Sequence, residues 1–300
     1  MLMRASRSLS LLAAAALSAA GLGAVSGCGS QKGAGSDTET LAHRARKVAS
    51  AWDGSTAAAA WRAGYHPMGE VVQLPRGGLR SQADKRAYQD HNFVLRGTLP
   101  DTRPKDGRVT WAGGGSLTRP LVGAIESYKT LAHGRTGGKP HLIVTGTKLG
   151  QMSVATSRGP AAVPAWLFTL DGYASALKQA AVIPSPLPRP PIERAHGVPG
   201  YPLDQLVDIA ADGRSVTVVA LHGACDDGPS VAVLETRGSV VLSGSVNHGK
   251  NDSGNCTKRA RLRRVTVKLA RPLGDRVLLD AHTGRPIPYK PSHGPSPSWT

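Results

Sequence analysis

The sequence predicts an α+β protein, in which N-terminal helices pack on a small antiparallel sheet and a mostly antiparallel β module with one disulfide follows. Three observations favour this class. Apolar residues recur at helical spacing over 41–62, strand-like runs fill 141–183 and 204–280, and the proline-dense segment Pro184–Pro191 separates the two groups of strands. A chain of 300 residues suffices for two modest domains, each with its own core.

The first 28 residues predict a lipoprotein leader. Arg4 and Arg7 give a short basic start, and residues 9–25 form an apolar run that is too short for a stable membrane span. The run ends in Val25-Ser26-Gly27-Cys28, and small residues directly before a cysteine are typical of a lipobox. We therefore expect residues 1–27 to be removed and Cys28 to be acylated, with a plain secretory leader as the alternative. Two acyl chains anchor a protein stably, so the expected location is the outer face of the cell membrane.

The charge of the chain indicates what surrounds it. The formal net charge is +17, and loss of Arg4 and Arg7 with the leader would leave about +15. On the outer face of a membrane, the nearest polyanions are lipid headgroups and wall polymers. The sequence therefore predicts a weak electrostatic attraction to an anionic membrane surface or to wall polymers, together with a protein partner of unknown identity. It predicts no nucleic-acid partner and no cofactor.

Residues 41–183 are expected to form the first module, behind a flexible polar tether over 28–40. An amphipathic helix ends at Trp52, and Ser55 or Thr56 can cap a second helix before Gly64. A short polar helix over 81–89 and then strands follow. The expected strands cover 93–99 and 108–112, joined as a hairpin, and 141–147, 151–157, 163–170 and 177–183.

Two short features of this module invite specific interpretations. Gly113-Gly114-Gly115-Ser116 lies before a possible helix over 117–131, which superficially suggests a phosphate loop. We discount that function because the Lys-Ser/Thr pair of a Walker-type loop is missing. Pro164 is expected at a sheet edge or a strand start, because proline cannot donate a hydrogen bond to a central strand.

The second module is predicted over 204–285, after a proline-rich linker at 184–203 and before a disordered tail at 286–300. Its pattern is almost purely β. The expected strands cover 204–210, 215–222, 230–236, 239–247, 261–270 and 276–280. In the strand at 261–270, Val265 and Val267 alternate with basic or polar residues, which predicts one buried face and one basic, solvated face.

Cys225 and Cys256 remain once Cys28 is assigned to lipid. An even pair of cysteines in an oxidising compartment predicts a disulfide. It would join two loops at one end of a small sandwich or barrel-like sheet. By chain entropy a loop of this size contributes roughly 3.5 to 4 kcal/mol.

Several motifs together resemble a known group of sequences. They are His222-Gly223-Ala224-Cys225-Asp226-Asp227, Glu235, Cys256, the run from Arg271 to Arg276, Asp280 and Thr283-Gly284, and an earlier pair of segments at 156–159 and 163–168. This set is similar to segments of actinobacterial secreted or membrane lipoproteins. The resemblance implies location and layout, and it implies no activity, substrate or catalytic residue.

Three enzymatic or metal-site interpretations are weaker than a structural one. The run from His222 to Cys225 resembles the Ser-His-Gly-Cys signature of L,D-transpeptidases, but it has an extra residue, and a disulfide would remove the thiolate. Ser175-Ala176-Leu177-Lys178 fits the S-x-x-K pattern of penicillin-binding enzymes, yet it lies in a strand-rich region instead of opening a helix. Zinc ligation by both cysteines with His222 and His248 lacks a C-x-x-C pair.

The sequence thus predicts a membrane-anchored extracytoplasmic lipoprotein that binds or scaffolds a partner without catalysis. The alternative is a cell-wall-active hydrolase or transpeptidase. The residues singled out are Cys28 for lipidation and Cys225 with Cys256 for the disulfide, with no catalytic residue and no metal ligand.

Overall fold

The computed structural model describes residues 33–102, 104–134, 138–248 and 259–293. This part of the chain is a mixed α/β structure with four helices and mostly β-sheet. The helices are α1 (Gly33–Trp52), α2 (Thr56–Ala63), α3 (Gln82–Gln89) and α4 (Ala124–Leu131). Within the described residues, none of these helices is long and apolar enough to span a membrane.

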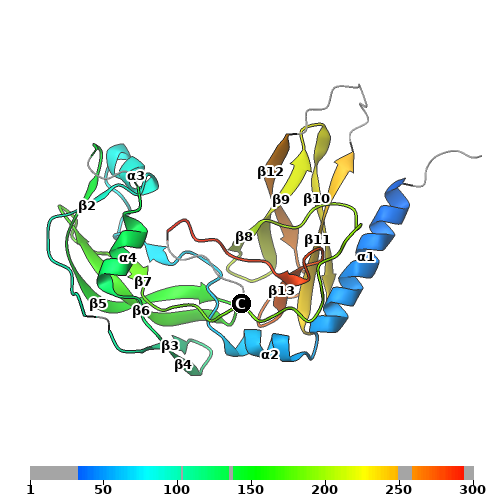
Figure 1. Cartoon of the computed structure of the whole chain (residues 1–300), viewed down its shortest axis with the longest axis horizontal. Helices are drawn as coiled ribbons and strands as arrows, with labels where there is room; N and C mark the ends of the chain where they lie inside the picture. Colours follow the sequence, from blue (N-terminus) through cyan, green and yellow to red (C-terminus); the bar gives the residue numbers. More distant parts are fainter. Residues whose placement is uncertain (1–32, 103, 135–137, 249–258, 294–300) are drawn as a thin grey trace, which may run out of the picture.

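The first module is built on a seven-stranded sheet, which lies on the left in Figure 1. Its strands are β1 (Val72–Gln73), β2 (Phe93–Leu95), β3 (Gly107–Trp111), β4 (Ser116–Arg119), β5 (Leu142–Thr156), β6 (Gly159–Leu170) and β7 (Leu177–Ala180). The order is β1-β7-β6-β3-β4, with β5 also paired to β6 and β2 paired to β5. The long β5–β6 hairpin is the centre of the module, because its inward residues alternate along both strands and form the largest single part of the first core.

Several predictions for this module are confirmed and others are wrong. Helix α3 begins after Ser81, whose hydroxyl accepts a hydrogen bond from the Asp84 amide at 3.0 Å, as expected of an N-cap. The hairpin between residues 93 and 112 does not form: β2 pairs with β5 in parallel, and β3 pairs with β4 and β6. The two strands expected between 141 and 157 are one continuous strand, β5.

The glycine-rich turn and Pro164 also differ from expectation. Residues 113–115 form the β3–β4 turn, where Gly114 and Gly115 adopt φ of 100° and 86°, so the turn leads into a strand instead of a helix. Pro164 lies inside β6, between the residues that pair with β3 and those that pair with β7. On its other side Pro164 pairs with Gln151 of β5, and its carbonyl accepts a hydrogen bond from the Ala181 amide at 2.9 Å. Because no residue of β3 or β7 pairs with the proline, its missing N–H is tolerated within a central strand.

The second module has two sheets, one of them covered by a helix. Its strands are β8 (Gln205–Ile209), β9 (Ser215–Gly223), β10 (Asp226–Glu235), β11 (Ser239–His248), β12 (Ala260–Lys268), β13 (Val277–Asp280) and β14 (Arg285–Pro286). The sheet β12-β9-β8 packs on one side of the sheet β10-β11-β13-β14, and all pairs are antiparallel except β11–β13. The six predicted strands are confirmed with ends displaced by a few residues.

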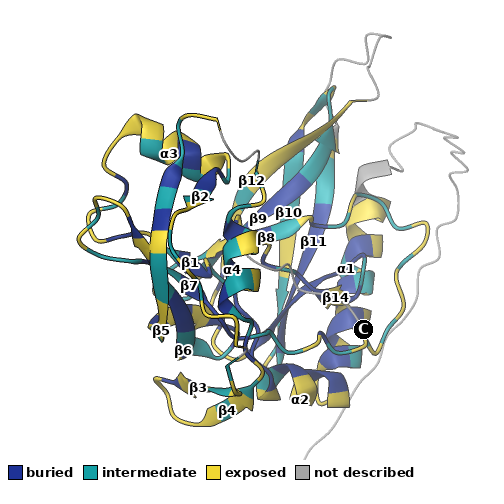
Figure 2. Ribbon diagram, turned by 60° about the vertical axis from the view of Figure 1, so that its left-hand side comes forward, coloured by how far each residue is buried: buried dark blue, intermediate teal, exposed yellow. Residues whose placement is uncertain are grey.

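The sequence predicts that the N-terminal helices pack on the first sheet, but in the structure they pack on the second module. Helix α1 covers the face of β10–β11 that points away from β9, and its buried residues belong to the second core (Figures 1 and 2). Trp52 is fully buried there, and its indole N–H donates to the carbonyl of Gly284 at 2.7 Å. The helix also begins at Gly33, so part of the expected tether at 28–40 is helical.

The expected linker and tail are also ordered parts of the fold. Within 184–203, Leu187 and Leu203 are buried in the second core. Beyond residue 285, Ile287 and Tyr289 are buried in that core too, and the chain then crosses to the first module (red in Figure 1). The prediction of a disordered tail is therefore wrong for residues 286–293. Their apolar side chains are spaced by prolines and follow no regular period, but they are buried at the joint between the modules.

Candidate functional site

A large hollow lies between α1 and the β10–β11 hairpin. It is a groove with a volume of about 600 Å³, within the range of small-molecule sites. The wall formed by α1 consists of Asp37, Thr38, Leu41, Ala42, Ala45 and Arg46. The floor formed by alternate residues of the hairpin consists of Ser230, Ala232, Leu234, Ser243, Ser245 and Asn247.

The strand register explains why the groove exists at this end of α1. Ser230 pairs with Ser245 and Ala232 pairs with Ser243, so four small side chains lie side by side on the face below the helix. Nearer the end of α1, Val48 and Trp52 are fully buried against the sheet and no space is left. The helix therefore packs tightly at its end and stands off the small floor residues near its beginning.

The chemistry of the groove suits binding more than catalysis. The serine and asparagine side chains of the floor can donate and accept hydrogen bonds, whereas Leu41 and Ala45 give the opposite wall an alkyl surface. Arg46 lies exposed on the rim. The described lining includes no histidine and no cysteine, and its one carboxylate belongs to Asp37 on α1.

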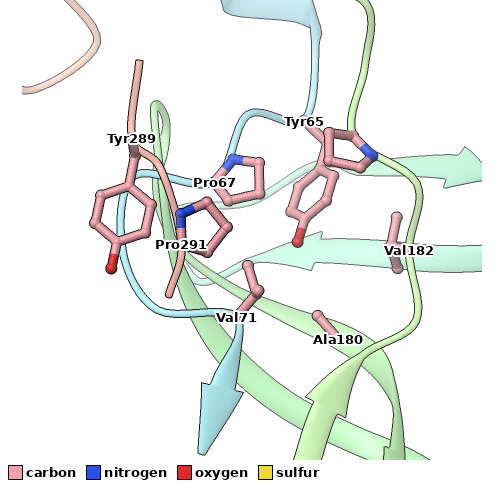
Figure 3. Close-up of a pocket in the computed structure, with 8 residues that line it drawn as sticks. Tyr65, Pro67, Val71, Ala180, Val182, Tyr289 and Pro291 are labelled. Atoms are coloured by element: carbon pink, nitrogen blue, oxygen red, sulfur yellow. The ribbon is translucent and has the colours of Figure 1, made fainter. Parts of the chain in front are cut away.

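Two small, mainly apolar cavities lie at the joint between the modules, beside the C-terminal segment. One of them, of about 20 Å³, is enclosed by residues of three segments that are far apart in sequence, including Tyr65, Val71, Val182, Tyr289 and Pro291 (Figure 3). A second, beside it, holds about 10 Å³. Such spaces hold at most a water molecule. A larger and more polar pocket of about 220 Å³ lies elsewhere at the joint, and it is lined by Arg62, Trp111, Gly113, Gly114, Arg158 and Asp275.

Tyr65 is one of two tyrosines that line this joint cavity. Its hydroxyl is buried and has no hydrogen-bond partner within the described part of the chain. Burial raises the pKa of the phenol, so it stays neutral. A neutral phenol surrounded by valine and proline side chains contributes packing and offers no general base.

Histidines gather at the same joint. The rings of Tyr88 and His293 stack with centroids 3.9 Å apart, and His91 lies 4.1 Å from His293 and 3.7 Å from His133. Burial lowers the pKa of His293 and of His91, and the nearby imidazoles lower it further. Among the described residues, no group of three such side chains has the arrangement of a metal site. The cluster therefore supplies an aromatic contact between the C-terminal segment and the first module.

The predicted site residues are only partly described. Cys225 lies in the turn between β9 and β10, whereas Cys28 and Cys256 lie outside the described residues. The lipidation and the pairing of Cys225 with Cys256 stay predictions. In the same turn, the His222 ring contacts the Gly223 carbonyl at 2.8 Å, and the Asp226 carboxylate accepts a hydrogen bond from the Gly223 amide at 2.6 Å.

The conspicuous motif in the second module is a structural network. The Arg276 guanidinium donates to the Glu235 carboxylate at 2.8 Å and to the carbonyls of Arg271 and Pro272 at 2.8 and 2.9 Å. Burial favours the neutral acid, but hydrogen bonds from the Ala270 amide and from Arg276 outweigh it and lower the pKa of Glu235. These residues shape the loop before β13 and do not face the groove.

Asp280 has a similar structural function. One of its carboxylate oxygens accepts a hydrogen bond from the Thr283 amide at 2.9 Å, and its carbonyl accepts one from the Gly284 amide. The resulting turn places the Gly284 carbonyl against Trp52. The motif residues Asp280, Thr283 and Gly284 thus hold the turn that fixes α1.

The S-x-x-K segment is not arranged for catalysis. Lys178 lies on β7, and the Ser175 hydroxyl precedes that strand and accepts a hydrogen bond from the Arg76 amide at 2.7 Å. A penicillin-binding serine must instead begin a buried helix with the lysine one turn later. Because Lys178 lies on a strand, it is not one helical turn beyond Ser175 as that motif requires.

Sequence reasoning did not identify the groove. The available signal was the alternation of Ser243, Ser245 and Asn247 in an otherwise apolar strand, since small polar residues at every second position mark a face that is not packed. Comparison of the chain with protein-family models, with curated proteins and with solved structures found no match. The site is therefore interpreted from its own geometry.

Proposed function

We propose that the protein is a lipid-anchored, extracytoplasmic binding protein whose ligand lies in the groove between α1 and β10–β11. The observation that supports this function is the groove itself, with about 600 Å³ of space and two walls of different chemistry. An occupant that fits both walls is a slender amphiphile. Its polar side would meet the hydroxyls of the floor, and its alkyl side would lie along Leu41 and Ala45.

The proposed location rests on the leader and on Cys28. The basic surface and the resemblance to actinobacterial secreted lipoproteins agree with a protein held at the envelope, near anionic lipid and wall polymers. The disulfide between Cys225 and Cys256 belongs to the same proposal, because the compartment outside the membrane is oxidising. Replacement Cys28→Ala should release the protein from membranes or leave its leader uncleaved, and unchanged membrane fractionation of that variant would refute the anchor.

The groove can be tested by filling it. Replacement Ala42→Trp places an indole on the lining wall, whereas Ser50→Trp adds the same group to the exposed side of α1. With the mature chain and a fluorescent fatty acid as probe, we expect saturable binding that Ala42→Trp abolishes and Ser50→Trp retains. Equal binding by both variants, or no binding by the parent chain, would refute an amphiphile site in the groove.

The alternative function, a cell-wall hydrolase or transpeptidase, makes a different prediction. The purified mature chain would then cleave or cross-link peptidoglycan fragments, and the products would appear by mass spectrometry. The groove proposal expects no product. Turnover that survives Ala42→Trp would place the chemistry elsewhere in the chain and favour the enzyme.

A further inference from the structure

The beginning of β12 carries an unusual concentration of unpaired positive charge. Arg259, Arg261, Arg263 and Arg264 are all exposed, and none of their side chains has a hydrogen bond or an ion pair among the described residues. Between them lies Leu262, whose side chain is 62% exposed, more than any other large hydrophobic residue in this part of the chain. We call these five residues the basic end.

The surrounding acidic groups do not neutralise the basic end. Asp226 and Asp227 lie at the start of β10, on the adjoining turn. The Asp226 carboxylate is engaged with the Gly223 amide at 2.6 Å, and Asp227 is exposed. Among the residues that the structure describes, four arginines against two aspartates leave this end positive, and it is therefore suited to a polyanion.

The basic end lies at the same end of the second module as the beginning of α1. Ala260 pairs with Gly223, the next turn leads into β10, and Asp226 pairs with the last residue of β11. Asn247 of β11 and Asp37 of α1 line the same groove, which brings the first turns of the helix to this end. Figure 1 shows this arrangement, with the beginnings of α1 and β12 and the end of β11 at the top right.

The position matters because of the proposed anchor. Cys28 precedes Gly33, the first residue of α1, by only five residues, which can span at most about 17 Å. An acylated Cys28 would therefore hold the beginning of α1 close to the bilayer. The basic end and the mouth of the groove lie on that side.

We propose that the basic end docks on an anionic lipid bilayer, with its arginines on headgroup phosphates and Leu262 in the interfacial region. This inference rests on the proposed anchoring and deepens it, because it gives the anchored protein one orientation. A wall polymer would satisfy the arginines equally, but it offers no apolar phase for an exposed leucine. A lipid surface offers both, and one acyl anchor combined with a basic patch binds more firmly than either alone.

The docked orientation has a consequence for the groove. Its floor residue Asn247 and its wall residue Asp37 lie at the end that would face the bilayer. A membrane amphiphile could then enter the groove from the lipid surface without crossing bulk water. The proposed ligand class and the proposed orientation are therefore consistent with each other.

The test uses the unacylated mature chain, residues 29–300, with sedimenting vesicles of phosphatidylglycerol and phosphatidylcholine in equal amounts, and with vesicles of phosphatidylcholine alone. The combined replacement of Arg261, Arg263 and Arg264 by Gln should weaken binding to the anionic vesicles at least tenfold. The matched control replaces three exposed arginines of the first module, Arg76, Arg96 and Arg108, by Gln, and it should change binding less than twofold. Leu262→Ser should weaken binding severalfold while leaving binding to soluble polyglycerol phosphate unchanged.

Each contrary result has a defined meaning. Equal losses in the two triple variants would show that net charge alone attracts the protein and would overturn the docking site. Binding to polyglycerol phosphate with no binding to vesicles would overturn the membrane in favour of a wall polymer. The assayed chain begins after Cys28 and carries no acyl group, so its binding does not depend on whether Cys28 is acylated. The variant Cys28→Ala tests acylation separately, in cells.

Discussion

The indole N–H of Trp52 donates to the carbonyl of Gly284 at 2.7 Å, across 232 positions of sequence. The donor ends α1, and the acceptor lies in the turn between β13 and β14. This buried contact fixes the end of the helix that is tightly packed, while the other end borders the groove. Helix α1 and the turn between β13 and β14 therefore belong to one structural unit.

Replacement Trp52→Phe removes this hydrogen bond and leaves the Gly284 carbonyl buried without its donor. We expect the free energy of unfolding to fall by about 2 kcal/mol, measured by urea denaturation. Trp61→Phe is the matched control, because the indole N–H of Trp61 is buried without a hydrogen-bond partner among the described residues. A loss in the control as large as in Trp52→Phe would show that indole volume, and not the hydrogen bond, stabilises this region.

A nick in the connecting segment tests whether the modules are independent. The sequence predicts a linker at 184–203 between two modules with separate cores, and a cut near residues 189–194 would then release two folded fragments. Arg194 is exposed and accessible to trypsin, but the fragment before it carries α1 and α2, which supply much of the second core. We expect the two nicked fragments to elute together on gel filtration and to separate only in denaturant. Separation into two folded monomers under native conditions would contradict this arrangement.

Features of the fold that depend on neighbouring residues could be predicted from the sequence, whereas features that depend on distant contacts could not. Strands β8 to β13 were predictable because alternation and turn residues are properties of neighbouring positions. The burial of Val48 and Trp52 was also predictable from their helical spacing. That spacing shows which face of the helix is buried, but it does not show which sheet the face packs against. Likewise, two strands near in sequence predict a hairpin, yet β2 has its partner in β5, some fifty residues further along the chain.

The buried tail and the groove were harder to predict for a related reason. Ile287 and Tyr289 are separated by prolines and follow no period, so only the completed core shows that they are buried. The groove depends on how far α1 stands from the serines of β10 and β11, which is a property of packing. The motif from Arg271 to Arg276 was conspicuous in the sequence, but the Arg276 side chain holds a loop by donating hydrogen bonds to the carbonyls of Arg271 and Pro272.

The ion pair between Glu235 and Arg276 should contribute to stability far more than an exposed pair. Arg276 and Glu235 are 6% and 14% exposed, and the arginine also holds three or more backbone carbonyls. We expect Glu235→Gln to lower the free energy of unfolding by about 3 kcal/mol, because a buried cation loses its counter-ion. The control is Asp204→Asn, which breaks the exposed pair with Lys290 and should cost less than about 1 kcal/mol. If Glu235→Gln and Asp204→Asn lowered the free energy of unfolding equally, the burial of Arg276 would contribute nothing to the stability of its ion pair.

The predicted disulfide is tested by counting thiols. Protein made in an oxidising compartment should show no free thiol from Cys225 or Cys256, with denaturant or without it. Reduction should lower the melting temperature of the chain, because the unfolded state regains loop entropy. An alkylated Cys225 in the native protein would refute the pairing and would strengthen the transpeptidase alternative.

His66 provides a pH-dependent test of the joint. Its side chain is 3% exposed, and its ring stacks on Trp61 with centroids 4.2 Å apart and an interplanar angle of 5°. Burial lowers the pKa of His66 to about 4, and the nearby Arg119 lowers it further. The imidazole is therefore neutral in the folded protein at neutral pH, and its Nε2 is buried without a hydrogen-bond partner among the described residues.

The depressed pKa fixes the sign of the pH effect. In the unfolded chain His66 takes up a proton near pH 6.5, whereas in the folded chain it resists protonation down to about pH 4, so the free energy of unfolding should fall as the pH drops through this interval. The loss from His66 should approach roughly 3 kcal/mol at the lower limit and vanish above pH 7. His66→Phe keeps an aromatic ring against Trp61 and removes the proton site, so urea denaturation at pH 7 and pH 5 should show a smaller drop for this variant than for the parent chain. His43→Gln, at an exposed position of α1, should retain the parental drop. Identical drops in the parent chain and in His66→Phe would show that His66 is protonated without cost in the folded protein, and that the joint is open to water at this position.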